Sequence, residues 1–130
     1  MKYLIMLLIV VGAALADFLT GIIKAYCTGS VNSAKMRRGG LNKLAEIIVM
    51  TTVCGLDTGI NALGQYYGAE QLSSFAGAIT AVSVFGYITV MEVISILENY
   101  RVINPEAQWV CNLVKRFTIS KEEKNDDNKN

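Results

Sequence analysis

Residues 72–97 read LSSFAGAITAVSVFGYITVMEVISIL, and Glu92 is the only charged side chain among them. A helix needs about 20 apolar residues to cross the ~30 Å hydrocarbon core of a bilayer. Residues 3–25 and 44–63 form two further apolar runs of similar length. The sequence therefore predicts an all-α integral membrane protein with about three transmembrane helices.

The composition is typical of a membrane protein and argues against several classes of function. Hydrophobic residues make up 52% of the 130-residue chain and charged residues 18%, whereas charged residues reach ~25% in ordinary soluble domains. The formal net charge of +1 provides no field that would attract nucleic acid. Histidine is absent, and the three cysteines show no C-x-x-C spacing. We therefore expect no enzymatic activity, no cofactor, no metal site and no nucleic-acid partner.

We expect three parts along the chain. Residues 1–104 form the transmembrane domain, residues 105–119 a short amphipathic helix, and residues 120–130 a disordered charged tail without apolar side chains. Pro105 suits the first turn of the short helix. Two placements stay open for that helix. With Lys115 and Arg116 on it, it could lie in the membrane interface, or it could lie in the cytoplasm, packed on neighbouring elements.

The basic residues predict the topology. A loop is expected at residues 26–43, and the loop at 64–71 has Glu70 as its only charged residue. Short loops rich in Lys and Arg stay cytoplasmic, which places the N-terminus outside and the C-terminus inside. The cytoplasmic basic loop carries four such residues: Lys35, Arg37, Arg38 and Lys43.

The N-terminal run also resembles a secretory signal. Ala14-Leu15-Ala16 imitates an A-x-A cleavage site. Cleavage there would export the basic loop, against the positive-inside preference. We therefore favour an uncleaved first span.

Polar side chains recur within or at the edges of the apolar runs. A carboxylate in hydrocarbon is expensive, so it usually faces other helices or water. Helical spacing places these side chains on one face of each run. We predict that this polar stripe lines a pore or a helix–helix contact and consists of Asp17, Thr20, Lys24, Glu46, Asp57, Asn61, Glu92, Ser95, Glu98 and Asn99.

Two interpretations of the stripe compete. In the first, the acids pair with Lys24, with hydroxyl groups or with loop bases and hold the helices in register. In the second, they face inward in an oligomer and become wetted when it opens. Four acids with Lys24 as the one nearby lysine cannot all pair within one protomer, so we favour the second interpretation.

Small residues recur every four positions in two of the runs. Such rows let helices approach closely in lipid, where burial of apolar area alone gives no driving force. They predict helix packing at Gly12, Ala16, Ser73, Gly77 and Ala81.

Three motifs resemble one known family. Residues 14–21, ALADFLTG, are similar to the "ALDYITG" signature of phage holins of the toxin-secretion/phage-lysis type, holin family 4. Residues 29–43, GSVNSAKMRRGGLNK, resemble that family's basic, glycine-bearing loop. Residues 92–99, EVISILEN, resemble its E-x-x-S-I-x-E-N element, and Pro105 follows at the usual place.

The resemblance implies a protein of the bacterial cytoplasmic membrane that associates into homo-oligomers. It then opens a timed lesion through which an endolysin or a toxin passes, without necessary direct contact and without covalent chemistry. Two other functions stay open. A small oligomeric ion channel or transporter subunit would use the acids for cation selectivity, and a structural partner would anchor a membrane complex through its tail.

Overall fold

The computed structural model describes residues 1–116. Three long helices follow one another: α1 (Lys2–Cys27), α2 (Ser33–Tyr66) and α3 (Glu70–Ile103). The described residues contain no strand. All three helices are long and apolar enough to cross a membrane, judged by length and composition. The prediction of an all-α protein with three membrane-crossing helices is confirmed.

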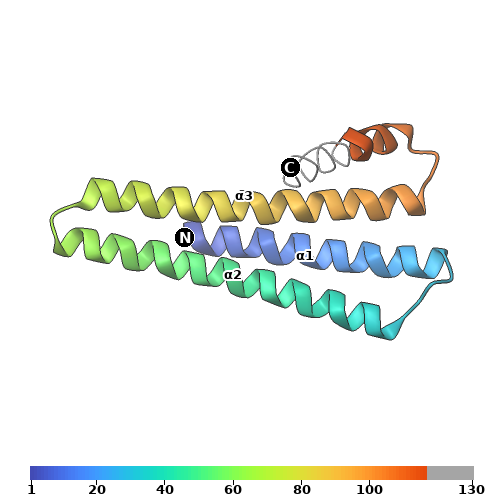
Figure 1. The fold of residues 1–130 in the computed structure, drawn as a ribbon, viewed down its shortest axis with the longest axis horizontal. Coiled ribbons are helices and arrows are strands. Elements are labelled where there is room, and N and C mark those ends of the chain that lie inside the picture. The colour runs from blue at the N-terminus through green and yellow to red at the C-terminus, as the bar shows by residue number, and fades with distance from the viewer. Residues whose placement is uncertain (117–130) are drawn as a thin grey trace, which may run out of the picture.

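The helices lie lengthwise beside one another (Figure 1). α2 and α3 form a hairpin, and α1 runs parallel to α3. α1 has 26 residues and each of the other two has 34, so the turn of the hairpin extends beyond the N-terminus of α1 (Figure 1). Gly29 and Gly68 occupy the two turns with φ of 64° and 68°, a conformation that glycine adopts without steric cost.

α2 begins ten residues before Lys43, at Ser33. The Asn32 side chain caps it by accepting hydrogen bonds from the backbone N–H groups of Ala34 and Lys35, at 2.9 and 3.1 Å. Asn is among the best N-cap residues because its side chain satisfies donors that lack an intrahelical partner. The prediction that the loop extends to residue 43 is therefore wrong. The four basic residues all lie on α2: Lys35, Arg37, Arg38 and Lys43.

The apolar core is small and lies about a third of the way along α1, at Val10. Its buried members come from all three helices and comprise Val10, Met50, Cys54 and Ile88. Many large apolar side chains point outward instead, among them Leu8, Ile48 and Val82. A helix bundle in lipid has this pattern because the hydrocarbon is as apolar as leucine, so no force drives these side chains inward.

The small residues predicted to pack between helices are buried on α3 but not on α1. Ser73, Gly77 and Ala81 are all buried on α3, and a Cβ added at Gly77 would collide with the Asp57 carboxylate on α2. Gly12 is exposed, and no atom lies within 4 Å of the position of its missing Cβ. Helix packing at Gly12 is therefore not found within residues 1–116. Neighbouring Ala16 is half-buried.

After α3 the chain turns back, and residues 108–116 are helical (Figure 1). Val110 and Val114 are buried, whereas Trp109 and Leu113 stay exposed. One face of this short helix therefore packs on its neighbours. The rest of the expected helix, residues 117–119, and the expected tail, residues 120–130, lie outside the described residues.

Candidate functional site: a polar network between the helices

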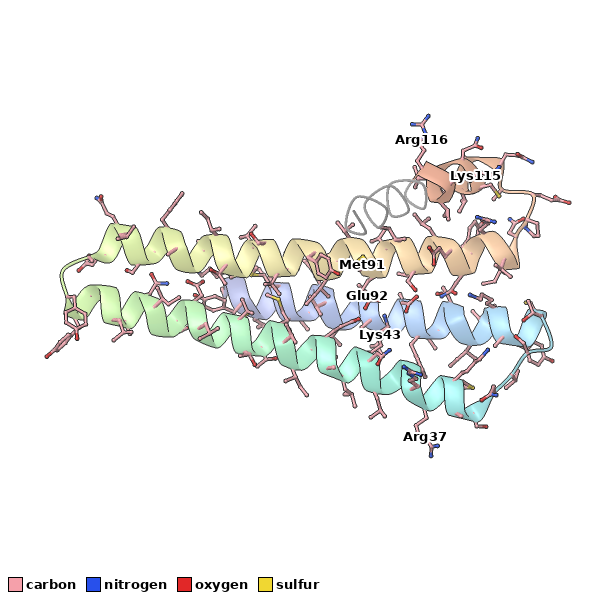
Figure 2. The ribbon with its side chains drawn as sticks, viewed as in Figure 1. Arg37, Lys43, Met91, Glu92, Lys115 and Arg116 are labelled. Carbon is pink, nitrogen blue, oxygen red and sulfur yellow. The ribbon has the colours of Figure 1, made fainter. Side chains whose placement is uncertain are left out.

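Lys43 joins carboxylates from all three helices, in a group that we call the Lys43 cluster (Asp17, Lys43, Glu46 and Glu92). The Lys43 Nζ atom lies 2.8 Å from Asp17 Oδ2 on α1. It donates to both Glu92 oxygens on α3, at 2.6 and 2.7 Å. Figure 2 shows the side chains of Lys43 and Glu92 directed into the bundle, while that of Arg37 points away from it.

The Lys43 cluster holds more acid than base. An ammonium group has three hydrogens to donate, and Asp17 and the two Glu92 oxygens account for them. Glu46 Oε2 lies farther away, at 3.7 Å, and is buried without a hydrogen-bond partner among the described residues. Three carboxylates thus share one ammonium group at a depth where each unpaired charge is costly.

Asn99 extends this network toward the end of α1. Its amide nitrogen donates to Asp17 Oδ1 at 3.0 Å and to Thr20 Oγ1 at 3.3 Å. Its amide oxygen accepts a 2.8 Å hydrogen bond from Lys24 Nζ. Asn99 is buried, so these contacts satisfy a polar group that would otherwise destabilise the helix interface.

A second group of polar side chains, the Asp57 cluster (Lys2, Tyr3, Asp57 and Asn61), lies on the far side of the apolar core. The Tyr3 hydroxyl donates to Asp57 Oδ2 at 2.8 Å, and Asn61 Nδ2 donates to Asp57 Oδ1 at 2.7 Å. Lys2 Nζ lies 3.3 Å from Asp57 Oδ2. Asp57 is 1% exposed, whereas the Lys2 side chain is 62% exposed, so this lysine reaches in from the surface.

These contacts correct part of the expectation that the four acids cannot all pair within one protomer. Asp17, Glu92 and Asp57 each pair with a lysine of the same chain, whereas Glu46 Oε2 lies 3.7 Å from the Lys43 that Asp17 and Glu92 already share. The early start of α2 places Lys43 at the depth of Asp17 and Glu92, and Lys2 pairs with Asp57. Lys24, the expected partner of the acids, binds Asn99 instead. Lys2 and Tyr3 were not among the predicted site residues, and their only signal in the sequence was their position at the start of an apolar run.

Two residues of the predicted stripe lie at the edge of the network. Ser95 is half-buried and lines a cavity beside Lys43. Glu98 is exposed and borders a shallow groove together with Arg101 and Val114. Neither side chain has a hydrogen bond or ion pair with the carboxylates of the two clusters in the described part of the chain.

Polar groups gather at two heights along the bundle axis, which we call the two polar levels. The distance between them is close to the thickness of the hydrocarbon core of a bilayer. Lys2, Asp57 and Gly77 meet at one level. Lys24 and Asn99 meet at the other, where Lys35 lines the same cavity. On each helix the two levels are separated by about 33 Å, at ~1.5 Å per residue. This distance matches the ~30 Å hydrocarbon core of a bilayer, and the Lys43 cluster lies between the levels.

Among known proteins, the sequence profile of the bacteriophage holin family matches residues 1–118. No significant match was found among curated proteins or among solved structures. The match covers the motifs at residues 14–21 and 92–99 that suggested the resemblance, and the chain belongs to the bacteriophage holin family.

Proposed function

We propose that the protein accumulates in the bacterial cytoplasmic membrane in a closed form, associates laterally and then opens a timed lesion. The lesion lets an endolysin or a toxin pass. Membership of the holin family supports this function, as do three helices that can cross a membrane. No covalent chemistry is part of it.

The observation that carries the proposal is the excess of acid in the Lys43 cluster. In the closed form, Asp17 and Glu92 share one lysine, and the buried Oε2 atom of Glu46 has no hydrogen-bond partner among the described residues. Water would hydrate all three carboxylates and remove this cost. Wetting therefore stabilises an open form more than the closed one, which is the property of a two-state element.

α1 is the element best suited to move. It contributes Asp17 to the Lys43 cluster, and Lys2 and Tyr3 to the Asp57 cluster. If α1 left the hairpin, it would uncover the polar side chains that α2 and α3 now direct toward it. In an oligomer, these faces of neighbouring hairpins would line a wet opening.

The experiment is inducible expression in a bacterium that also makes a cytosolic endolysin and a cytosolic fluorescent protein. Growth, membrane potential and release of the fluorescent protein are followed together. We expect abrupt lysis with release, dependent on both genes.

The alternatives give different results in the same culture. Depolarisation with the fluorescent protein retained would replace the large lesion by a small ion channel, whose acids select cations. Continued growth at normal potential would reject both and leave a structural partner.

A further inference from the structure

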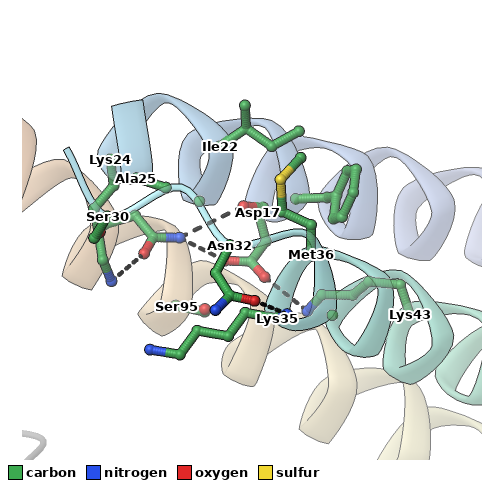
Figure 3. Close-up of a pocket in the computed structure, with 14 residues that line it drawn as sticks. Asp17, Ile22, Lys24, Ala25, Ser30, Asn32, Lys35, Met36, Lys43 and Ser95 are labelled. Atoms are coloured by element: carbon green, nitrogen blue, oxygen red, sulfur yellow. Dashed lines mark hydrogen bonds and ion pairs between the residues drawn. The ribbon is translucent and has the colours of Figure 1, made fainter. Parts of the chain in front are cut away.

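A cavity of about 380 Å³ lies at the end of the bundle where α1 passes into α2. Small-molecule sites occupy about 300–1,000 Å³, so the space suits a ligand of headgroup size. All three helices contribute to its wall (Figure 3). It adjoins the Lys43 cluster but is not filled by it.

The wall of the cavity is cationic. Lys24, Lys35 and Lys43 line it together with a single acid, Asp17. That acid already binds Lys43 and Asn99. Lys35 is exposed, and within residues 1–116 its ammonium group has no ion-pair partner. A ligand entering the cavity therefore meets the ammonium group of Lys35, which no carboxylate of residues 1–116 neutralises, whereas Lys43 is already held by Asp17 and Glu92.

Hydroxyl and amide groups stand beside these lysines, and an apolar wall faces them. Ser30 and Asn32 lie on the turn between α1 and α2, and the Lys35 side chain runs past Asn32 in the close-up (Figure 3). The apolar part of the lining comprises Phe18, Ile22 and Met36. Cationic and hydroxyl donors suit a phosphate group, and an apolar wall suits a hydrocarbon chain.

We propose that this cavity binds the phosphate group of an anionic phospholipid, with Lys24 and Lys35 as its cationic contacts and an acyl chain along Phe18 and Ile22. The cavity lies at one of the two polar levels, where lipid headgroups meet the hydrocarbon core. Basic pockets between membrane helices bind anionic headgroups in this way. A bound lipid would bridge α1 and α2 and hold the closed form.

The test titrates the purified full-length protein in neutral detergent with dioctanoyl phosphatidylglycerol, dioctanoyl phosphatidylcholine and inorganic phosphate. We expect phosphatidylglycerol to bind at least about fivefold more tightly than phosphatidylcholine. Lys35→Gln should weaken phosphatidylglycerol binding by roughly fivefold, the value of ~1 kcal/mol per lysine near a membrane surface. The matched control is Arg37→Gln, which removes the same charge from a side chain pointing away from the bundle (Figure 2).

A second variant tests the space inside the cavity while leaving its charge unchanged. Gly39 lines the cavity, and no atom lies within 4 Å of the position of its missing Cβ. Gly39→Leu should fill the space, keep every lysine and also weaken binding, with helicity by circular dichroism unchanged. Equal losses in Lys35→Gln and Arg37→Gln would reduce the effect to diffuse surface attraction and overturn the proposal. Displacement of the lipid by equimolar inorganic phosphate would make it a site for free anions.

Discussion

Lys43 is held between carboxylates that come from different helices, with Asp17 at 2.8 Å and Glu92 at 2.6 Å. Removing one partner of a buried ion pair typically costs about 3–5 kcal/mol, because the other charge stays buried without compensation. Replacing a buried charge by an apolar side chain is far cheaper where the remaining charges can still pair. Loss of Lys43 should therefore destabilise the closed form more than loss of one of its carboxylates.

Opposite shifts in the time of lysis are expected from Lys43→Met and Asp17→Leu. Lys43→Met leaves Asp17 and Glu92 buried without a cation, which destabilises the closed form and should advance lysis. Asp17→Leu leaves Lys43 paired with Glu92 in the closed form, but it places an apolar side chain in the wetted opening and should delay lysis. The measurement is the onset of lysis after induction, at equal protein levels in the membrane.

Lys43→Arg is the control for this pair, since it keeps the charge. Its lysis should begin closer to the wild-type time than that of Lys43→Met. Shifts of the same sign in Lys43→Met and Asp17→Leu would reject the wetting of the cluster as the switch.

Gly77→Ala should destabilise the bundle. The new Cβ would meet the Asp57 carboxylate and the Asn61 amide nitrogen, and Tyr3 and Asn61 hold that carboxylate in place. Overpacking of this kind costs about 1–3 kcal/mol. Thermal unfolding in detergent measures the loss. Gly86→Ala is the matched control on the same helix, because no atom lies within 4 Å there. Equal melting temperatures for the two variants would contradict close packing at Gly77.

α1 contacts the α2–α3 hairpin through three groups of side chains along its length. The Asp57 cluster holds its first residues, the apolar core packs on it about a third of the way along through Val10, and the Lys43 cluster holds it just past its midpoint through Asp17. The outer two attachments are polar and the middle one is small. In the proposed function, such attachments would let α1 be stable in the closed form and leave it when water reaches the polar groups.

Tyr3→Phe should loosen α1 at its N-terminus. It removes the 2.8 Å hydrogen bond to Asp57, and a hydrogen bond to a charged group contributes about 1.5–3 kcal/mol. We expect faster amide hydrogen exchange in the first turns of α1 and earlier lysis. Tyr26→Phe makes the same chemical change in the same helix at a side chain that is 81% exposed, and it should change neither. A Tyr3→Phe variant with wild-type exchange would show that this attachment does not hold α1.

For the whole molecule, we infer the position of the bundle in a bilayer from the two polar levels. The segment between them is about 33 Å long on each helix. The turn of the α2–α3 hairpin extends beyond one level, and Tyr66 and Tyr67 stack edge to face there with centroids 5.0 Å apart. Tyrosine is enriched where membranes meet water. The basic residues at the other level, with Lys35 and Arg38 on α2, favour the cytoplasmic side.

Thiol labelling tests this orientation. In spheroplasts, a membrane-impermeant maleimide should label Tyr67→Cys in the hairpin turn, in a Cys111→Ser background. Native Cys27, which is exposed at the end of α1, should be labelled only after the membrane is permeabilised. Buried Cys54 should react in neither state. Labelling of Cys27 in intact spheroplasts would invert the topology.

The sequence by itself determined the helical, membrane-crossing architecture and the family. Apolar length predicts a spanning helix because backbone groups in lipid have to be satisfied within the helix itself, which is a local property. The motifs at residues 14–21 and 92–99 are also local strings. For the same reason the sequence placed Asp17, Asn61, Glu92 and Asn99 among the polar residues of the spans.

Only the tertiary structure decided which polar groups meet. Lys43 and Glu92 are 49 positions apart, and Tyr3 and Asp57 are 54 apart. Whether such residues touch depends on where each helix begins and how it is rotated about its axis. The cap at Asn32 extended α2 through residues that read as a basic loop, and this carried Lys43 to the depth of the acids. Pairing in the membrane thus follows from helix register, which periodicity within one helix does not specify.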